Sequence, residues 1–147
     1  MEMIRMGNTT KSKYSIDAVG EKYGFSDLTE IINILRSPGG CPWDIKQTHE
    51  SLKECLVEES GEVISAIDSH DDENLCEELG DLLLQVVMHA QIAAEEGRFT
   101  IDDVIQGVSE KMIRRHPHVF GDVSVADDRE SLDLWKQIKE QEKKDRL

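Results

Sequence analysis

Apolar residues recur at helical spacing along most of this chain, and no stretch shows the two-residue alternation of a strand. Five segments carry the helical pattern, and we expect helices over about 26–36, 48–69, 71–96, 100–116 and 127–143. The pattern therefore predicts an all-α bundle.

Polar and helix-breaking residues set the expected ends of these helices. Gly97 and Pro117 are expected to end the third and fourth helices. We expect loops at "CPWDIKQ" (41–47) and "HPHVFGD" (116–122), and a weakly ordered lead-in over residues 1–24. The expected N-caps are Ser26, Thr48, Asp71 or Asp72, and Thr100 with Asp103 as its capping-box partner.

The third predicted helix is apolar nearly all round its axis from Leu79 to Ala94. A helix of this kind is buried on most of its sides. In a chain of 147 residues, such burial indicates that a second subunit supplies part of the cover. We therefore expect the chain to associate with further copies through this helix, which by itself does not set the number of subunits.

Composition indicates which classes of partner to exclude and where in the cell to expect the protein. A length of 147 residues predicts one domain, and a net charge of −14 argues against a surface that binds nucleic acid through its phosphates. No stretch approaches the roughly 20 apolar residues of a membrane span, and no signal peptide is visible, so we expect a cytoplasmic protein without membrane partners. Cys41, Cys55 and Cys76 lack C-x-x-C spacing and are expected to be free, with Cys55 and Cys76 as small core hydrophobes.

Carboxylates lie on or beside the apolar faces of two neighbouring helices. Glu59 and Glu62 share one face, as do Glu78 and Asp81, because residues three apart point the same way. The short link between the helices makes them antiparallel, so the four carboxylates are expected to face one another. Such a cluster needs raised pKa values or a cation, and oxygen ligands alone select Mg²⁺ or Mn²⁺. The alternative is that these are ordinary solvated carboxylates.

The chain resembles the MazG family of nucleoside triphosphate pyrophosphohydrolases in three stretches: "GGCPWDIKQTHESLKECLVEESGEVISAI", "EELGDLLLQVVMHAQIA" and "KMIRRHPHVF". The core motif is E-E-x-x-E followed by E-x-x-D, and the resemblance defines a domain over 25–147. It implies a helical bundle with a four-helix core, usually a tight dimer. It also implies Mg²⁺-dependent hydrolysis of a nucleoside triphosphate to the monophosphate and pyrophosphate.

The resemblance also assigns roles to individual residues. It implies substrate contacts at Lys111, Arg115 and Trp135, although the first two could instead stabilise a helix C-terminus and Trp135 could anchor the core. The implied metal ligands are Glu59, Glu62, Glu78 and Asp81. Together with Glu58, which lies at the edge of these acids, Glu59 and Glu62 form the catalytic group that we expect.

Other polar residues near these positions receive lesser roles. Glu58 is the candidate general base, or else a surface glutamate. Gln85 and His89 continue the face of Glu78 and Asp81 and are expected to hydrogen-bond within the bundle. His116 and His118 are expected to be loop and cap residues.

Three functions are compatible with these features. The first is Mg²⁺-dependent pyrophosphohydrolysis by a metal-activated water, as a housekeeping removal of excess or non-standard nucleotides. The second is a narrower enzyme for dUTP, dCTP or phosphoribosyl-ATP. The third is a catalytically silent bundle that binds nucleotide or a protein partner.

Overall fold

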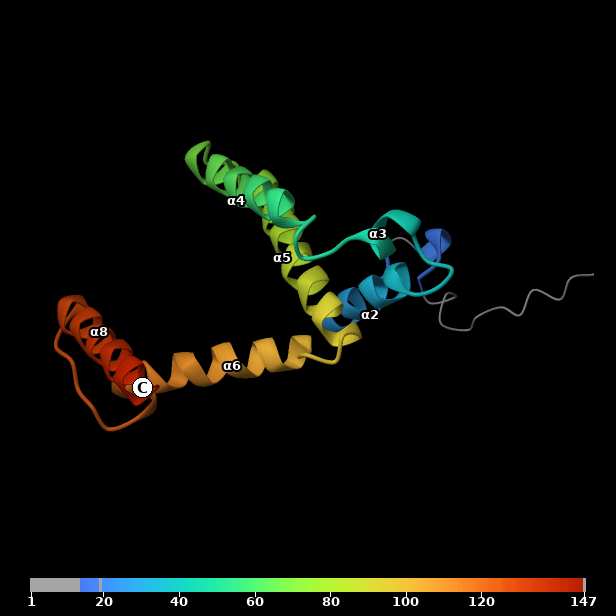
Figure 1. The fold of residues 1–147 in the computed structure, drawn as a ribbon. Coiled ribbons are helices and arrows are strands. Elements are labelled where there is room, and N and C mark those ends of the chain that lie inside the picture. Colours follow the sequence, from blue (N-terminus) through green and yellow to red (C-terminus); the bar gives the residue numbers. More distant parts are fainter. Residues whose placement is uncertain (1–13, 19, 147) are drawn as a thin grey trace, which may run out of the picture. The chain divides into compact units, whose positions relative to one another are not determined.

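The structure is a computed structural model that describes residues 14–18 and 20–146. Over this part every regular element is a helix, and no strand occurs (Figure 1). This confirms the prediction of an all-α protein. Residues 1–13 of the expected lead-in lie outside the described residues. No described helix is long and apolar enough to cross a membrane.

The chain divides into two compact units, Met1–Arg98 and Phe99–Leu147. The helices of the first unit are η1 (Ile16–Ala18), α2 (Phe25–Arg36), α3 (Pro42–Lys46), α4 (Lys53–Asp68) and α5 (Asp72–Glu95). Those of the second unit are α6 (Ile101–Arg114), α7 (Pro117–Phe120) and α8 (Asp128–Asp145).

In the first unit, α4 and α5 form an antiparallel hairpin, and α2 packs against α5 (Figure 1). Asp71 caps α5, as predicted, because its Oδ1 accepts a hydrogen bond from the Asn74 N–H at 3.1 Å. Gly97 ends α5, also as predicted, with a positive φ of 70°. The Arg98 N–H then donates to the Ala93 carbonyl at 3.0 Å, which is the long bond of a Schellman motif.

The core of the first unit joins α2, α5 and the residue that precedes α4. Leu52 and Val87 are almost completely buried. They pack with Ile32, Met88 and Ile92, and burial of such side chains supplies most of the stability of a domain. Because Leu52 comes directly before Lys53, this core fixes the start of α4.

Several predicted boundaries are wrong in detail. The expected loops at 41–47 and 116–122 contain the short helices α3 and α7, because Pro42 and Pro117 occupy first helical positions, which proline favours. Thr48 does not cap α4. It exchanges hydrogen bonds with Ser51 in a turn, and α4 begins five residues later.

The start of α2 also differs from the prediction. Gly24, rather than Ser26, occupies the N-cap position. The Gly24 N–H donates to Asp27 Oδ2 at 2.8 Å, so the carboxylate of the first turn holds the entry to the helix.

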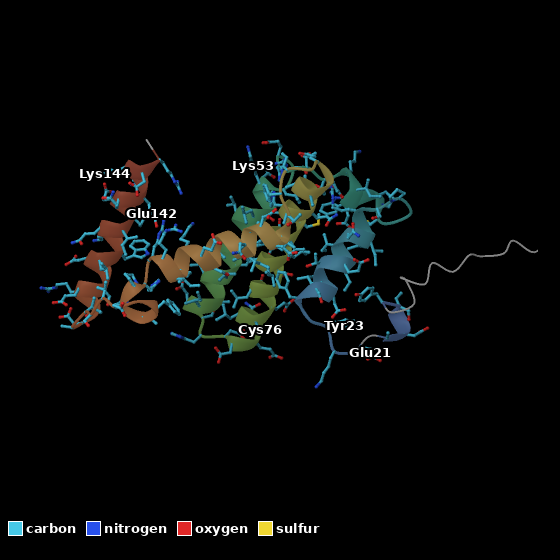
Figure 2. The ribbon with its side chains drawn as sticks, turned by 90° about the horizontal axis from the view of Figure 1, so that it is seen from below. Glu21, Tyr23, Lys53, Cys76, Glu142 and Lys144 are labelled. Atoms are coloured by element: carbon cyan, nitrogen blue, oxygen red, sulfur yellow. The ribbon has the colours of Figure 1, made fainter. Side chains whose placement is uncertain are left out.

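Helix α5 is less enclosed within one chain than its composition suggests. Gln85, Val87 and Met88 are buried, but Leu79, Leu83 and Val86 keep 48%, 39% and 41% of their surface exposed. Cys76 is free and also exposed, so its expected place in the core is wrong (Figure 2). Cys55 packs against the core as expected.

The second unit is held by capped helices and a charged contact between α6 and α8. Thr100 and Asp103 form the predicted capping box, with the Thr100 N–H donating to Asp103 Oδ2 at 2.8 Å. Glu142 of α8, labelled in Figure 2, accepts hydrogen bonds from Arg114 at 2.6 Å and from Arg115 at 2.9 Å. These bonds tie the end of α6 to α8.

Candidate functional site

Three carboxylates of the first unit converge between α4 and α5. Oxygen atoms of Glu59, Glu78 and Asp81 lie within 4.8 Å of one another. Glu78 and Asp81 are one turn apart on α5, and Glu59 reaches them from the antiparallel α4. The cluster therefore arises from helical spacing on two adjacent helices, and no loop is needed to build it.

Glu62 and Glu58 lie at the edge of this acid cluster, defined as Glu59, Glu78 and Asp81. Glu62 is the neighbour with the largest effect on the pKa of Glu78, so it lies beside the cluster, although it is exposed to solvent. Glu58 is exposed, and its charge contributes only weakly to the environment of Glu59.

Mutual repulsion and burial perturb the acids of the cluster. The hydrogen bond with Glu62, followed by burial and the charges of Glu62, Asp81 and Glu59, raises the pKa of Glu78 to about 7. Burial, followed by the charges of Asp81 and Glu62, also raises the pKa of Glu59. Ionising every acid is therefore unfavourable unless a positive charge compensates.

The donor set fits a hard divalent cation. Glu59 Oε2 and Glu78 Oε2 are buried and have no hydrogen-bond partner among the described residues. Buried carboxylate oxygens without a partner are costly, and a cation would satisfy them. All the available donors are oxygens, which Mg²⁺ and Mn²⁺ prefer to nitrogen or sulfur. The acid cluster can therefore hold a metal ion.

The residues expected to contact substrate lie in the second unit. Lys111 is partly buried near the end of α6. Arg115 is largely buried and engaged by Glu142, and its guanidinium carbon lies 5.6 Å from the centre of the Trp135 ring. Lys139 Nζ lies 4.2 Å from the same ring centre, so two cations contact the Trp135 indole.

A cavity that the sequence did not indicate lies beside Trp135. It has a volume of about 370 Å³. Its lining residues are His116, His118, Ser131, Leu132 and Trp135. His118 Nδ1 is buried without a hydrogen-bond partner in the described part of the chain. The two histidines are expected from the sequence only as loop and cap residues, and they line a cavity as well. Nothing in the sequence pointed to this cavity because the short helix α7, which positions them, has no apolar period.

Gln85 and His89 lie further along α5 on the side of the acid cluster. Gln85 is buried, and its Oε1 has no partner among the residues described. His89 makes the hydrogen bond expected of it, but its partner is His49 from the turn before α4.

Comparison with known proteins decides the family. The family model of the MazG nucleotide pyrophosphohydrolase domain matches residues 47–120, which include the whole acid cluster. The chain belongs to the MazG family. A crystal structure of a mazG-related protein from Thermotoga maritima superposes with a TM-score of 0.65 at 35% identity, covering 78% of this chain and 98% of that one.

Curated MazG relatives are longer than this chain. A nucleoside triphosphate pyrophosphohydrolase/pyrophosphatase MazG of Thermotoga maritima is 59% identical over 81% of this chain and 45% of its own length. The nucleoside triphosphate pyrophosphohydrolase of Escherichia coli is 48% identical over 79% and 44%, respectively. The uncharacterized protein YabN of Bacillus subtilis is 59% identical over 81% and 24%. This MazG chain thus spans about a quarter to a half of these relatives.

Proposed function

We propose that this MazG chain hydrolyses nucleoside triphosphates to the monophosphate and pyrophosphate, with Mg²⁺ held by Glu59, Glu62, Glu78 and Asp81. Mn²⁺ would substitute. The observation that carries the proposal is the convergence of three carboxylates within 4.8 Å, with two buried oxygens left without a partner. Relatives named for this hydrolysis support the same reaction.

The chain's own residues would prepare the reaction by binding and by proton transfer. Glu59, Glu78 and Asp81 would supply inner ligands, and the exposed Glu62 would complete the set beside Glu78. Bound Mg²⁺ would neutralise phosphate oxygens and lower the pKa of a water molecule. Glu58 is adjacent to Glu59 and open to solvent, which supports the proposal that its carboxylate would accept the proton of the attacking water.

We also propose that the second unit offers substrate contacts of its own, at Lys111, Arg115 and Trp135. Lys111 and the C-cap residue Arg115 lie one turn apart at the end of α6, and two cations at this spacing suit a triphosphate. Arg115 already donates a hydrogen bond to Glu142. A phosphate would therefore have to share Arg115 with this carboxylate or displace it. Trp135 offers an aromatic face for a nucleobase beside the 370 Å³ cavity.

A homodimer is part of the proposal. Leu79, Leu83 and Val86 form one stripe of α5 and are 39–48% exposed, and exposed apolar stripes of this kind mark association surfaces. A second copy of the α4–α5 hairpin would cover the stripe and complete a four-helix core.

The reaction is tested by product analysis. The chain is incubated with each common ribo- and deoxyribonucleoside triphosphate, with and without Mg²⁺, and the phosphorus products are separated. Monophosphate and pyrophosphate in equal amounts, only with the metal, are expected. Turnover of many triphosphates would support a housekeeping enzyme, and turnover of one would support the narrower alternative. Release of orthophosphate alone would exclude the proposed cleavage site, and absence of any product would favour a silent binding protein.

A further inference from the structure

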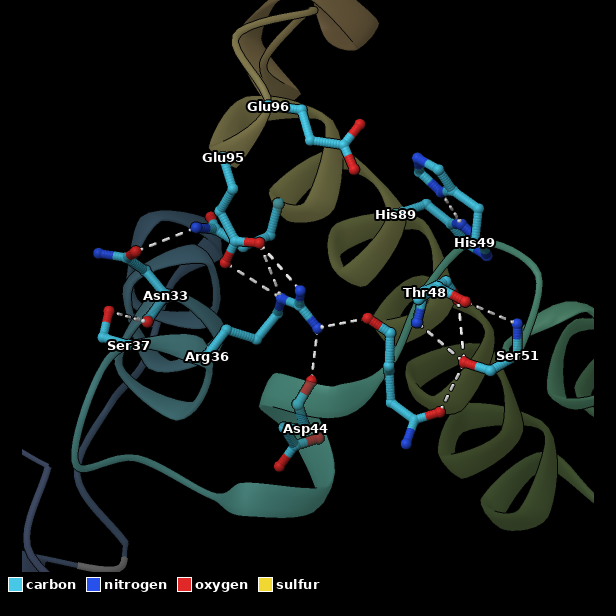
Figure 3. Close-up of polar contacts among 12 residues, drawn as sticks. Asn33, Arg36, Ser37, Asp44, Thr48, His49, Ser51, His89, Glu95 and Glu96 are labelled. Carbon is cyan, nitrogen blue, oxygen red and sulfur yellow. Dashed lines mark hydrogen bonds and ion pairs between the residues drawn. The ribbon is translucent and has the colours of Figure 1, made fainter.

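Two histidines meet at the end of the α4–α5 hairpin opposite its turn. His49 and His89 place their Nδ1 atoms 2.7 Å apart, joined by a dashed line in Figure 3. Their rings are nearly parallel, at 5°, with centres 5.0 Å apart. That separation equals the Nδ1–Nδ1 distance plus the radius of each ring. The two rings are therefore edge to edge, with the hydrogen bond in their common plane.

An arginine fixes which nitrogen of each ring carries a proton. Arg98 Nη2 lies 2.5 Å from His49 Nε2, and a guanidinium can only donate, so His49 Nε2 accepts. His49 must then carry its proton on Nδ1 and donate it to His89 Nδ1. His89 in turn carries its proton on Nε2. The network thus selects one tautomer for each histidine.

Arg98 is held in place from two directions. Its backbone N–H closes the Schellman motif at the end of α5 by donating to Ala93. Its Nε pairs with Glu96 Oε2 at 2.7 Å. The guanidinium is consequently oriented before it reaches His49.

The histidine pair and the acid cluster lie along the same pair of segments. His49 precedes Glu59 by ten residues, while His89 follows Asp81 by eight and Glu78 by eleven. His89 shares α5 with Glu78 and Asp81, and His49 lies in the turn that leads into α4, which carries Glu59. A contact between His49 and His89 therefore stabilises the same alignment of α4 and α5 that brings Glu59 to Glu78 and Asp81.

We propose that His49 and His89 are positioning residues: through one proton shared between their Nδ1 atoms, with tautomers imposed by Arg98, they hold the start of α4 against α5 and so maintain the spacing of the acid cluster. The inference rests on the proposed metal-dependent function. It assigns a role to side chains that touch neither metal nor substrate.

The arrangement requires both rings to be neutral. Of the four ring nitrogens, His49 Nε2 and His89 Nδ1 accept hydrogen bonds and His49 Nδ1 donates one. His89 Nε2 bears its proton and has no partner among the described residues. An added proton must therefore break the bond to Arg98 or the bond between the rings. Burial, followed by the charge of His49, lowers the pKa of His89, which favours the neutral pair. The charged groups around the pair are Arg98, which pairs with Glu96, and Glu50, whose pKa is affected by the charge of His49. Figure 3 also shows the Arg36–Glu95 ion pair on the same part of the unit.

The tautomers are read directly by ¹H–¹⁵N correlation spectra of the imidazole rings in the full chain. At neutral pH, His49 should show a protonated Nδ1 and His89 a protonated Nε2. Arg98→Met should leave His49 as a mixture of tautomers and let the pair take up a proton at higher pH. Arg129→Met removes an equal charge from an exposed position of α8 and should change neither. Tautomers that are reversed, or unaffected by Arg98→Met, would overturn the proposal.

The positioning role is tested by measuring the Mg²⁺ affinity of the nucleotide-free chain by calorimetry. His89→Leu should weaken binding by about tenfold, the usual effect of losing a residue that supports metal ligands. His89→Asn keeps an acceptor near the Nδ1 position and should restore most of the affinity, and circular dichroism checks that both variants fold. Unchanged affinity in folded His89→Leu would refute the role. If the wild type binds no Mg²⁺, the proposed function fails, and the positioning role falls with it, whatever the tautomers.

Discussion

The strongest quantitative prediction concerns the coupling of metal binding to protons at Glu78. The pKa of this carboxyl group is raised to about 7, whereas an unperturbed glutamate titrates at 4.5. A ligand carboxylate must be ionised, so Mg²⁺ has to displace the proton. Changing the pH between 8 and 6 therefore perturbs the metal site without any mutation.

The magnitude follows from the fraction of Glu78 that is ionised. With a pKa near 7, this fraction is about nine tenths at pH 8, about half at pH 7 and about one tenth at pH 6. The apparent Mg²⁺ affinity should consequently fall about tenfold from pH 8 to pH 6. At pH 7, each bound ion should release about half a proton from this site.

In the metal-free protein, the contribution of Glu78 to stability changes with pH in the opposite direction to that of an acid in a salt bridge. Because the pKa of Glu78 is raised on folding, its contribution to stability is complete below pH 4.5 and is lost as the pH rises through 7. Removing Mg²⁺ should therefore destabilise the protein more at pH 8 than at pH 6, measured by thermal unfolding with and without the metal.

Isothermal titration calorimetry measures the affinity and the proton count together. Mg²⁺ titrations at pH 6, 7 and 8, each in two buffers of different ionisation enthalpy, give the protons released. Glu77→Gln, which neutralises an exposed neighbour, should keep the pH dependence, and Glu78→Gln should lose it. Equal affinity at pH 6 and pH 8 without proton release would refute the reasoning.

Four further changes test separate parts of the structure. Glu59→Gln should abolish turnover while circular dichroism stays helical; unchanged turnover would remove this residue from the site. Leu52→Ala should cost about 2–5 kcal/mol in chemical denaturation, because Leu52 is only 1% exposed in the core. Leu83→Asp should shift the sedimentation coefficient towards the monomer. Two arginines lower the pKa of Glu142 to about 2, so its stabilisation should be present above pH 4.5 and disappear as the pH falls towards 2 in acid unfolding; a Glu142→Gln variant should show no such loss.

Local features of the fold could be predicted from the sequence. Asp71, Gly97 and the Thr100–Asp103 capping box act within one turn of their own helix, and the structure contains all three. The helices α3 and α7 could not be predicted in the same way. Each has five residues or fewer, which is too short for an apolar period, and only the proline at its start marks it.

The site was predictable only where it depends on helical spacing. Glu78 and Asp81 share a face by their separation alone, and the short hairpin brings Glu59 to them. His49 lies in a turn and meets His89 only after α4 has packed on α5, so no periodicity could pair them. The bond between Arg115 and Glu142 likewise joins two residues that are 27 positions apart in the chain.

The most direct test of the metal site is anomalous scattering from crystals of the chain grown with Mn²⁺. An anomalous peak within coordination distance of Glu59, Glu78 and Asp81 is predicted, and it should disappear in Glu59→Gln. A protein that turns over triphosphates while its Mn²⁺ lies elsewhere, with these three carboxylates bound to no ion, would contradict the account.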